Sequence, residues 1–190
     1  MVRWPGKIKA GTVSNDIMSH LDWLPTLLAT AGEPDIKGKL KKGHRAGKKK
    51  FKVHLDGYNF LPYLTGKEKK GPREEFFYFS DDGDLTALRF DNWKVVFAQQ
   101  RAQGTMLVWS EPLVMTRLPW LYNLRTDPYE RASITSNTYW DWYLDHAFLL
   151  VPAQAYVGKF LESFKEFPPR KKAASFTIDQ VMEKLVPPSH

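Results

Sequence analysis

Apolar residues recur at helical spacing near the start of the chain. Residues 19–32, SHLDWLPTLLATAG, form the clearest such stretch. Ser19 or Asp22 can cap a helix here, and Pro25 suits a first turn whose N–H groups have no helical partners. Gly32 is well suited to the position just after the last turn. Leu24, Leu27, Leu28 and Ala31 recur at helical spacing, which predicts one helix.

The segments on either side of this helix are shorter and richer in turn-forming residues. Trp4-Pro5-Gly6 is typical of a strand end followed by a turn. Residues 37–52 are strongly basic and predict an exposed loop or a loose hairpin, and residues 55–66 predict a compact connection that ends at Gly66. A complete α/β domain would show several strand–helix alternations. This region shows about one, which favours a domain cut in the middle.

The pattern changes at about residue 74 to short segments that are rich in aromatic and β-branched residues. Residues 74–80, 84–90 and 92–100 have this character. Asp81-Asp82-Gly83 separates the first two segments, and Asp91-Asn92 separates the second and third. We therefore predict an antiparallel meander. Further strands are indicated within residues 104–110 and within residues 120–124.

Helical spacing returns from about residue 137. Residues 138–150 and 152–167 predict two helical runs, with Pro152 either kinking one helix or opening the second. Residues 177–185 predict a last short helix, with Thr177 and Gln180 in capping-box spacing. The expected fold class is therefore α/β overall and α+β within this chain, with a small antiparallel sheet covered by C-terminal helices.

Composition and charge narrow the class of protein. The chain has 190 residues, of which 43% are hydrophobic, enough to bury a core. No apolar run approaches the roughly 20 residues of a membrane span. Net charge is +7, but residues 37–52 hold eight Lys and one Arg and no acid. The rest of the chain has 19 basic against 21 acidic residues. This segment can attract a polyanion or can simply keep the protein soluble.

Candidate catalytic chemistry is scarce. The chain has no cysteine, which excludes disulfides and thiolate chemistry. The turn Ser80–Asp84, SDDGD, does not have the full calcium-loop pattern with its distant Glu. There is no nucleophile elbow and no phosphate-binding glycine loop. Five histidines lie scattered, without metal-ligand spacing: His20, His44, His54, His146 and His190.

Several motifs together resemble a known family. RWPGKIKAG with DWLPTLLATAG resembles the closing part of the catalytic domain of sulfatases, and LDGYNFLPYLTG resembles the connection that follows it. GPREEFFYF, ALRFDNWKVVF and LYNLRTDPYERA resemble the start, the Arg…Trp-Lys strand pair and the late Asp-Pro-x-Glu motif of the smaller C-terminal subdomain. The motifs cover residues 1 to about 135 in the family's order, and the later aromatic helices are similar to those of bacterial arylsulfatases.

The resemblance implies an alkaline-phosphatase-like fold and places the chemistry of the family upstream. Sulfatases use a formylglycine made from Cys or Ser in Cys/Ser-x-Pro-x-Arg, together with a calcium ion. The only Ser-x-Pro here, Ser110-Glu111-Pro112, is followed by Leu113 and not by x-Arg. We therefore expect this chain to be the C-terminal part of an arylsulfatase, with no catalytic or metal-binding residue and no activity alone. Calcium and formylglycine are expected in the part of the enzyme that precedes it.

The resemblance also divides the chain. Residues 1–66, with the basic loop 37–52, are expected to end the catalytic α/β domain. Residues 67–190 are expected to form the C-terminal subdomain, with a sheet over 75–124 and helices over 137–186. Loops of this subdomain are expected to approach the substrate. Asp81, Asp82 and Arg101 are the candidate pocket residues, and the alternative for the two acids is that they only shape a turn.

The resemblance leaves three functions open. The first is a sulfuric-ester hydrolase acting on a sulfate-ester small molecule or glycan, in which this chain completes the core and walls the substrate pocket. The second is a phosphodiesterase or phosphonate monoester hydrolase of the same superfamily. The third is a non-catalytic polyanion-binding module that uses the basic segment. No nucleic-acid partner is expected. A periplasmic or extracellular location follows from the resemblance, and the sequence does not indicate an oligomeric state.

Overall fold

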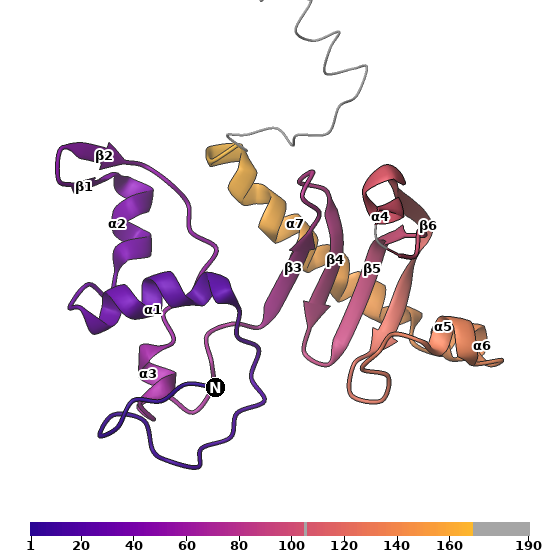
Figure 1. Ribbon diagram of the computed structural model, residues 1–190, viewed down its shortest axis with the longest axis horizontal. Helices are drawn as coiled ribbons and strands as arrows, with labels where there is room; N and C mark the ends of the chain where they lie inside the picture. Colours follow the sequence, from indigo (N-terminus) through magenta and orange to yellow (C-terminus); the bar gives the residue numbers. More distant parts are fainter. Residues whose placement is uncertain (105, 169–190) are drawn as a thin grey trace, which may run out of the picture.

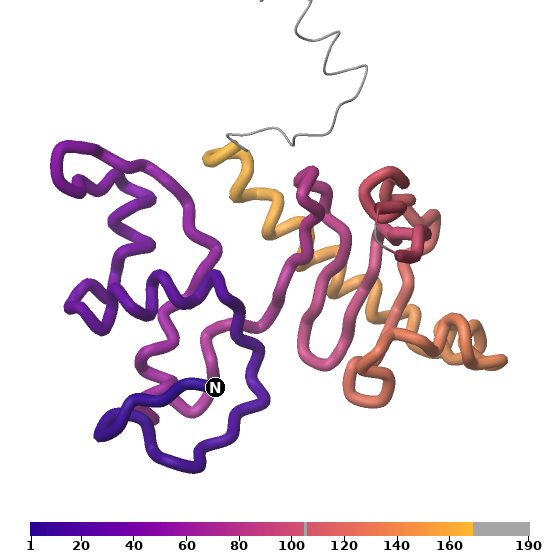
Figure 2. Tube along the Cα trace, viewed as in Figure 1, coloured from indigo at the N-terminus to yellow at the C-terminus, as the bar shows by residue number. Residues whose placement is uncertain are grey.

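A helical N-terminal region lies beside a four-stranded sheet in the computed structural model (Figure 1), which describes residues 1–104 and 106–168. The first residues run past the short helix α3 (Figure 2). They are tied to that region where the Ser14 hydroxyl contacts the Tyr63 hydroxyl and where the Gly71 N–H donates to Asp16 Oδ2 at 2.6 Å. No helix in these two ranges is long and apolar enough to cross a membrane.

The predicted helix at residues 19–32 is confirmed and begins with a turn of 3₁₀-helix. The Ser19 hydroxyl accepts the Leu21 N–H at 3.3 Å, so Ser19 is the cap, and Gly32 takes a φ of 95° just beyond the end. The elements of this region are η1 (His20–Asp22), α1 (Trp23–Thr30), α2 (Ile36–Lys42), β1 (His44–Ala46), β2 (Lys49–Phe51) and α3 (Leu61–Leu64).

Two expectations for this region need correction. Trp4 begins a turn, since its carbonyl accepts the N–H groups of Lys7 and Ile8, but no strand is found at this point of the described chain. A strand needs a hydrogen-bonding neighbour, and the segment meets none here. The basic segment is a hairpin only in its second half. Its first half, which was expected to be part of an exposed loop or a loose hairpin, is the helix α2. Ile36, the first residue of this helix, is buried.

The predicted meander is confirmed. The strands β3 (Glu75–Phe79), β4 (Leu85–Phe90), β5 (Trp93–Gln100) and β6 (Leu113–Asn123) lie in the order β3-β4-β5-β6, and every neighbouring pair is antiparallel. The strand predicted within residues 120–124 is the end of the long β6.

The strand predicted within residues 104–110 is wrong. The last residues of β5 pair with the start of β6, where Gln100 faces Leu113 and Gln99 faces Val114. The edge of β5 is therefore already occupied by β6. The apolar stretch before Leu113 instead forms the short helix α4 (Leu107–Ser110). The residues of this stretch favour a β-strand, but no free strand edge is available for them to pair with, so they do not form one.

The C-terminal helices cover one face of the sheet. They are α5 (Ala132–Thr135), α6 (Tyr139–Asp145), η2 (Ala147–Leu149) and α7 (Leu150–Glu166). Pro152 is the third residue of α7, so it opens the second helical run and does not kink the first. The helix predicted at residues 177–185 lies outside the described residues. Figure 1 shows α7 crossing behind the strands.

The main core lies between this sheet face and the helices. Its fully buried members are Leu88, Val95 and Leu121 from the strands and Tyr139 and Tyr143 from α6. The phenol oxygens of both tyrosines are satisfied by backbone. The Tyr139 hydroxyl donates to Leu121 O and accepts its N–H, each at 3.0 Å, and the Tyr143 hydroxyl donates to Pro119 O.

Aromatic contacts hold α7 along the sheet. The Phe160 ring stacks on Phe77 with centroids 4.1 Å apart, and it also contacts Phe79 near the end of β3. Tyr156 contacts Phe90 one turn earlier in the helix. These rings hold α7 against β3 and β4.

Candidate functional site

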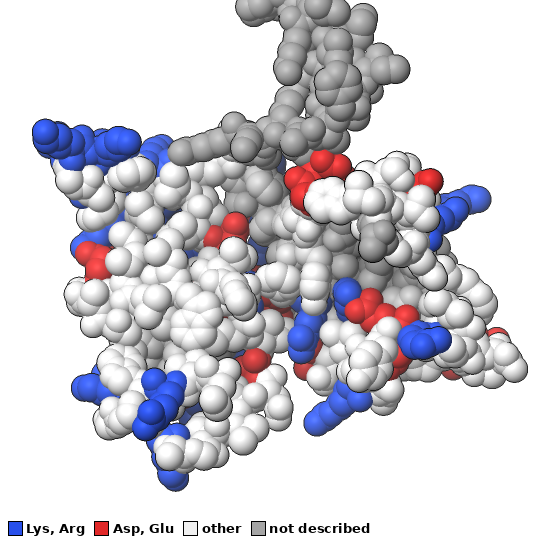
Figure 3. Space-filling view, viewed as in Figure 1, with Lys and Arg blue, Asp and Glu red and all other residues white. Residues whose placement is uncertain are grey.

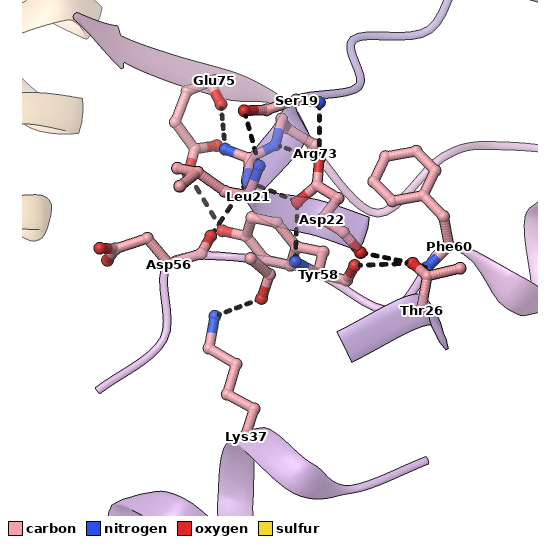
Figure 4. A network of polar contacts seen from close by, with 11 residues as sticks. Ser19, Leu21, Asp22, Thr26, Lys37, Asp56, Tyr58, Phe60, Arg73 and Glu75 are labelled. Atoms are coloured by element: carbon pink, nitrogen blue, oxygen red, sulfur yellow. Dashed lines mark hydrogen bonds and ion pairs between the residues drawn. The ribbon is translucent and has the colours of Figure 1, made fainter. Parts of the chain in front are cut away.

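The most buried polar group of the described chain is the carboxylate of Asp22. Asp22 is 0% exposed, and it accepts four hydrogen bonds (Figure 4). The N–H of Ser19 donates to Oδ2 at 2.7 Å, which closes the capping box at the start of η1. The N–H of Tyr58 donates to Oδ1 at 2.8 Å. The remaining two bonds come from Arg73, through Nε to Oδ2 at 2.9 Å and Nη2 to Oδ1 at 2.6 Å.

Arg73 is bound as completely as its partner. Its Nη1 donates to the Glu75 carbonyl at 3.1 Å, and its Nη2 donates to the Asp56 carbonyl at 3.0 Å. Its guanidinium lies over the Tyr58 ring at 4.8 Å. Three segments that are far apart in the sequence therefore meet at one ion pair: the start of the first helix, the connection 55–60 and the entry to β3. This cluster of Asp22, Tyr58 and Arg73 is called the buried clamp below.

The clamp is built to hold backbone and not to perform chemistry. A carboxylate has about four acceptor positions, and all of those of Asp22 are used. Thr26 extends the arrangement, since its hydroxyl donates to Asp22 O at 2.6 Å and accepts the Phe60 N–H at 2.9 Å. Because both charges are paired and hydrogen-bonded, the cost of burying them is offset only while each has the other.

A polar cleft of about 380 Å³ opens beside the clamp, between the N-terminal helices and α7. Lys37, His54, Tyr58, Glu75 and Lys159 are among the residues that line it. The Tyr58 hydroxyl donates to Glu75 Oε1 at 3.1 Å, and Lys37 Nζ lies 4.3 Å from the centre of the Tyr58 ring. Both acidic and basic side chains line the cleft, so it does not favour a ligand of one charge over the other.

Burial changes the titration of two of these groups. Burial, helped by the negative charge of Glu75, raises the pKa of Tyr58 to about 12. Burial lowers the pKa of Lys37, although the nearby Asp56 carboxylate works in the opposite direction. Tyr58 is therefore a hydrogen-bond donor at neutral pH and not a base.

The two candidate acids lie at the tip of the β3–β4 hairpin, as the sequence pattern predicts. The Gly83 N–H donates to Ser80 O at 3.1 Å, and the Ser80 N–H donates to Asp84 O at 2.9 Å. Gly83 has a φ of 85°, which a residue with a side chain rarely adopts. Asp81 and Asp82 are both exposed at this turn.

Arg101 lies at the same end of the sheet, just after β5. It borders a hollow of about 520 Å³ on the sheet face that α7 does not cover. The hollow is also lined by Tyr78, Lys94, Trp120 and Tyr122, and the two candidate acids are not among its lining residues. Topology thus brings the turn 80–84 and the connection 101–112 to one end of the sheet (Figure 2), but only Arg101 faces the hollow.

The Asp-Pro-x-Glu motif sits at the opposite end of the sheet and is structural. Asp127 accepts the backbone N–H groups of Arg131 and Ala132 at 3.0 and 2.8 Å and thereby starts α5. Glu130 forms an ion pair with Lys94 of β5 at 2.6 Å. Asp127 and Glu130 thus fix the chain just after it leaves β6.

The described residues do not fit the catalytic groups of sulfatases. No group of three or more His, Cys, Asp or Glu among residues 1–104 and 106–168 could hold a metal ion. Ser110, the one serine in a Ser-x-Pro sequence, lies in the exposed helix α4, and its hydroxyl donates to the Leu107 carbonyl. Among the described residues, calcium would therefore have no ligand set, and no residue is placed as a formylglycine precursor.

Sequence reasoning missed the buried clamp. It assigned Asp22 a capping role and gave Arg73 no role at all. Asp22 and Arg73 are 51 residues apart, and no periodicity links them. In the sequence Arg73 is followed directly by Glu74 and Glu75, so its local surroundings give no signal that its partner is Asp22.

The chain matches known proteins along most of its length. Residues 71–185 match the family described as the C-terminal region of aryl-sulfatase. Arylsulfatase A of Homo sapiens is 30% identical over 141 residues, which cover 69% of this chain and 24% of that protein. Arylsulfatase A of Bos taurus is 31% identical over 143 residues, again 69% of this chain and 24% of that protein.

Two further similarities are shorter or looser. An ulvan-active sulfatase of Formosa agariphila is 35% identical over 68 residues, 36% of this chain and 10% of that protein. A solved sulfatase from Pseudoalteromonas sp. aligns with a TM-score of 0.44 and 23% identity over 63% of this chain and 23% of that chain, which is too loose to add to the assignment. The chain spans about a quarter of the length of the arylsulfatase A proteins it matches.

Proposed function

Because the chain belongs to the family of aryl-sulfatase C-terminal regions, we propose that it forms the C-terminal part of a sulfuric-ester hydrolase, where it completes the core and walls the substrate pocket. The similarity to two arylsulfatase A proteins supports this role. The substrate would be a sulfate-ester small molecule or glycan. By family resemblance the enzyme would work in the periplasm or outside the cell.

The observation that carries the pocket role is the placement of two loops at one end of the sheet. The turn 80–84 and the connection 101–112 project from the same end, beside the hollow that Arg101 borders. A cation there can attract the sulfate anion through the field of the pocket. The carboxylates of Asp81 and Asp82 would repel it, so we assign them to the leaving-group side, where they can accept hydrogen bonds from substrate hydroxyls.

The reacting groups would come from a preceding segment of the enzyme. That segment would supply the formylglycine nucleophile and the calcium ion, and this chain would supply shape and a positive charge. The 190-residue chain alone should then cleave no aryl sulfate, with or without calcium. The reading frame upstream of Met1 should encode Cys-x-Pro-x-Arg or Ser-x-Pro-x-Arg.

The test compares two arginine variants of the enzyme that includes this upstream segment. Arg101→Gln should raise KM for aryl sulfates several-fold, because a pocket cation is lost. Arg125→Gln removes an exposed charge beyond β6, at the other end of the sheet, and should leave KM unchanged. Equal kinetics for both variants would contradict the pocket role. Faster turnover of phosphodiesters or phosphonate monoesters than of sulfates would favour that alternative within the superfamily.

A further inference from the structure

The hairpin β1–β2 concentrates the positive charge of the protein. Lys48, Lys49 and Lys50 lie at its turn and along β2, and Arg45 lies on β1. All four are exposed, and no described acidic side chain forms an ion pair with any of them. Figure 3 shows the resulting cluster of Lys and Arg at the upper left, over the labels β1 and β2 of Figure 1.

The strand register sets two of these cations against each other. Arg45 is the direct cross-strand partner of Lys50, so both side chains leave the same face of the hairpin. Like charges in this position destabilise a sheet, and a two-stranded hairpin has little stability to spare. An anion placed between Arg45 and Lys50 would remove this repulsion and gain two charge-assisted hydrogen bonds.

The hairpin is also fixed to the body of the protein. The Val53 N–H donates to the Leu40 carbonyl at 3.1 Å and ties the end of the hairpin to α2. Lys41 of α2 pairs with Glu166 at 3.3 Å, at the end of α7. The charges are therefore displayed on an anchored element, so an anion that binds them has less chain entropy to overcome than on a loose loop.

The same end of α7 lies near the turn between β3 and β4. Phe160, less than two turns before Glu166, contacts Phe79, and Phe79 immediately precedes the turn that carries Asp81 and Asp82. In Figure 1 the hairpin β1–β2 and the turn between β3 and β4 both lie toward the top of the molecule. A linear polymer that lies on the hairpin can thus extend toward the sheet end.

We propose that the β1–β2 hairpin is a docking surface for a sulfated polysaccharide, which it holds through Arg45, Lys48 and Lys50 while the chain continues toward the pocket. The proposal rests on the proposed function, because sulfate esters are the group that the enzyme would cleave. The hairpin has a single aromatic residue, Phe51, and is therefore poorly suited to stack successive bases of a nucleic acid. It also has no apolar face with which to enter a membrane.

Binding of heparin to the 190-residue chain tests the proposal directly. The Arg45→Gln/Lys50→Gln variant should bind heparin about 25-fold more weakly, since each of the two cations near a polyanion contributes roughly fivefold. The matched control, Lys67→Gln/Lys69→Gln, removes the same charge from an exposed segment elsewhere and should change the affinity less than about twofold. Melting temperatures of both variants should equal that of the parent chain, because exposed changes are usually within about 0.5 kcal/mol.

Competitors distinguish the sulfated polysaccharide from other polyanions. Desulfated heparin, a DNA duplex and vesicles with anionic lipid should each bind more weakly than heparin at equal salt. Equal loss of heparin affinity in both double variants would overturn the proposal, because net charge alone would then explain binding. DNA or vesicles that bind as tightly as heparin would overturn the choice of partner. None of these measurements requires turnover. If the enzyme cleaves no sulfate ester, the proposed function is wrong, but heparin binding can still be measured.

Discussion

The guanidinium of Arg73 donates two hydrogen bonds, of 2.9 and 2.6 Å, to the fully buried carboxylate of Asp22. Asp22 belongs to the first helix and Arg73 to the entry of the sheet. The pair thus joins the N-terminal region to the four-stranded sheet. It also orients the connection between them, since Arg73 holds the Asp56 carbonyl and Asp22 holds the Tyr58 N–H.

Breaking this pair should destabilise the protein strongly. In Arg73→Met the Asp22 carboxylate stays buried with two of its four hydrogen bonds lost, and such a change costs about 3–5 kcal/mol in the free energy of unfolding. Chemical denaturation followed by circular dichroism measures it. Arg125→Met, at an exposed position, should change the free energy of unfolding by less than about 0.5 kcal/mol.

A double variant separates the buried charge from the lost packing. Adding Asp22→Asn to Arg73→Met removes the unpaired charge, so it should recover part of the lost stability. If the double variant is instead as unstable as the sum of the two single changes, the pair has no coupling energy and the clamp is wrong.

Alkaline pH should weaken the fold through buried tyrosines. Burial raises the pKa of Tyr58 and of Tyr139 from 10.0 to about 12. The neutral phenols therefore stabilise the folded protein fully below pH 10, and this contribution is lost as the pH rises toward 12, because the unfolded chain releases its protons first. We expect the free energy of unfolding to decrease between pH 10 and pH 12. The phenolate absorbance, measured in parallel, follows the ionisation of the tyrosines.

Tyr139→Phe provides the control for this pH dependence. The variant should be less stable at neutral pH, because the backbone of Leu121 loses its partner hydroxyl. Its stability should also fall less steeply between pH 10 and 12, since one raised pKa is gone. An unchanged slope would show that Tyr139 ionises as an ordinary exposed tyrosine.

The sheet and its helices were readable from the sequence because their signals are local. Aromatic and β-branched residues mark β4 and β5, and Asp81-Asp82-Gly83 is a turn that needs no distant partner. The segment before Leu113 shows the limit. Its β-branched and aromatic residues favour a strand, but the strand that fills the edge of β5 is the next one along the chain, so the segment forms α4 instead.

The buried clamp could not be predicted from the sequence, for a related reason. Asp22 has the local features of a capping-box residue, and its carboxylate does accept the N–H of the cap residue Ser19. That its carboxylate also accepts Arg73 depends on how the connection 55–60 folds back, and this path is set by tertiary packing. The turn that carries Asp81 and Asp82 and the strand end before Arg101 lie where the sequence predicts them, because turn position follows from strand order.

The backbone conformation of Glu130, which pairs with Lys94, predicts that its glycine variant is more stable than its alanine variant. Glu130 has a φ of 56°, a left-handed conformation that costs a residue with a side chain about 1–2 kcal/mol. Glu130→Ala keeps this strain and loses the pair with Lys94, whereas Glu130→Gly loses the pair but relieves the strain. We expect Glu130→Gly to be more stable than Glu130→Ala by about 1 kcal/mol in thermal denaturation. The reverse order would mean that the left-handed turn is not kept in solution.

Asp82 tests the proposed pocket wall in the enzyme that includes the upstream segment. On the leaving-group side its carboxylate would accept hydrogen bonds from substrate hydroxyls, and Asp82→Asn would weaken them. The ratio of kcat/KM for a hydroxyl-bearing sulfate ester to that for a simple aryl sulfate should then fall by about fivefold or more, as expected for the loss of a charge-assisted hydrogen bond. Asp145→Asn, at an exposed position at the end of α6, should leave this ratio unchanged. Identical ratios for Asp82→Asn and the parent enzyme across a panel of sulfate esters would mean that Asp81 and Asp82 only shape the turn. In that case Arg101 and the connection that follows it would be the remaining candidates at this end of the sheet.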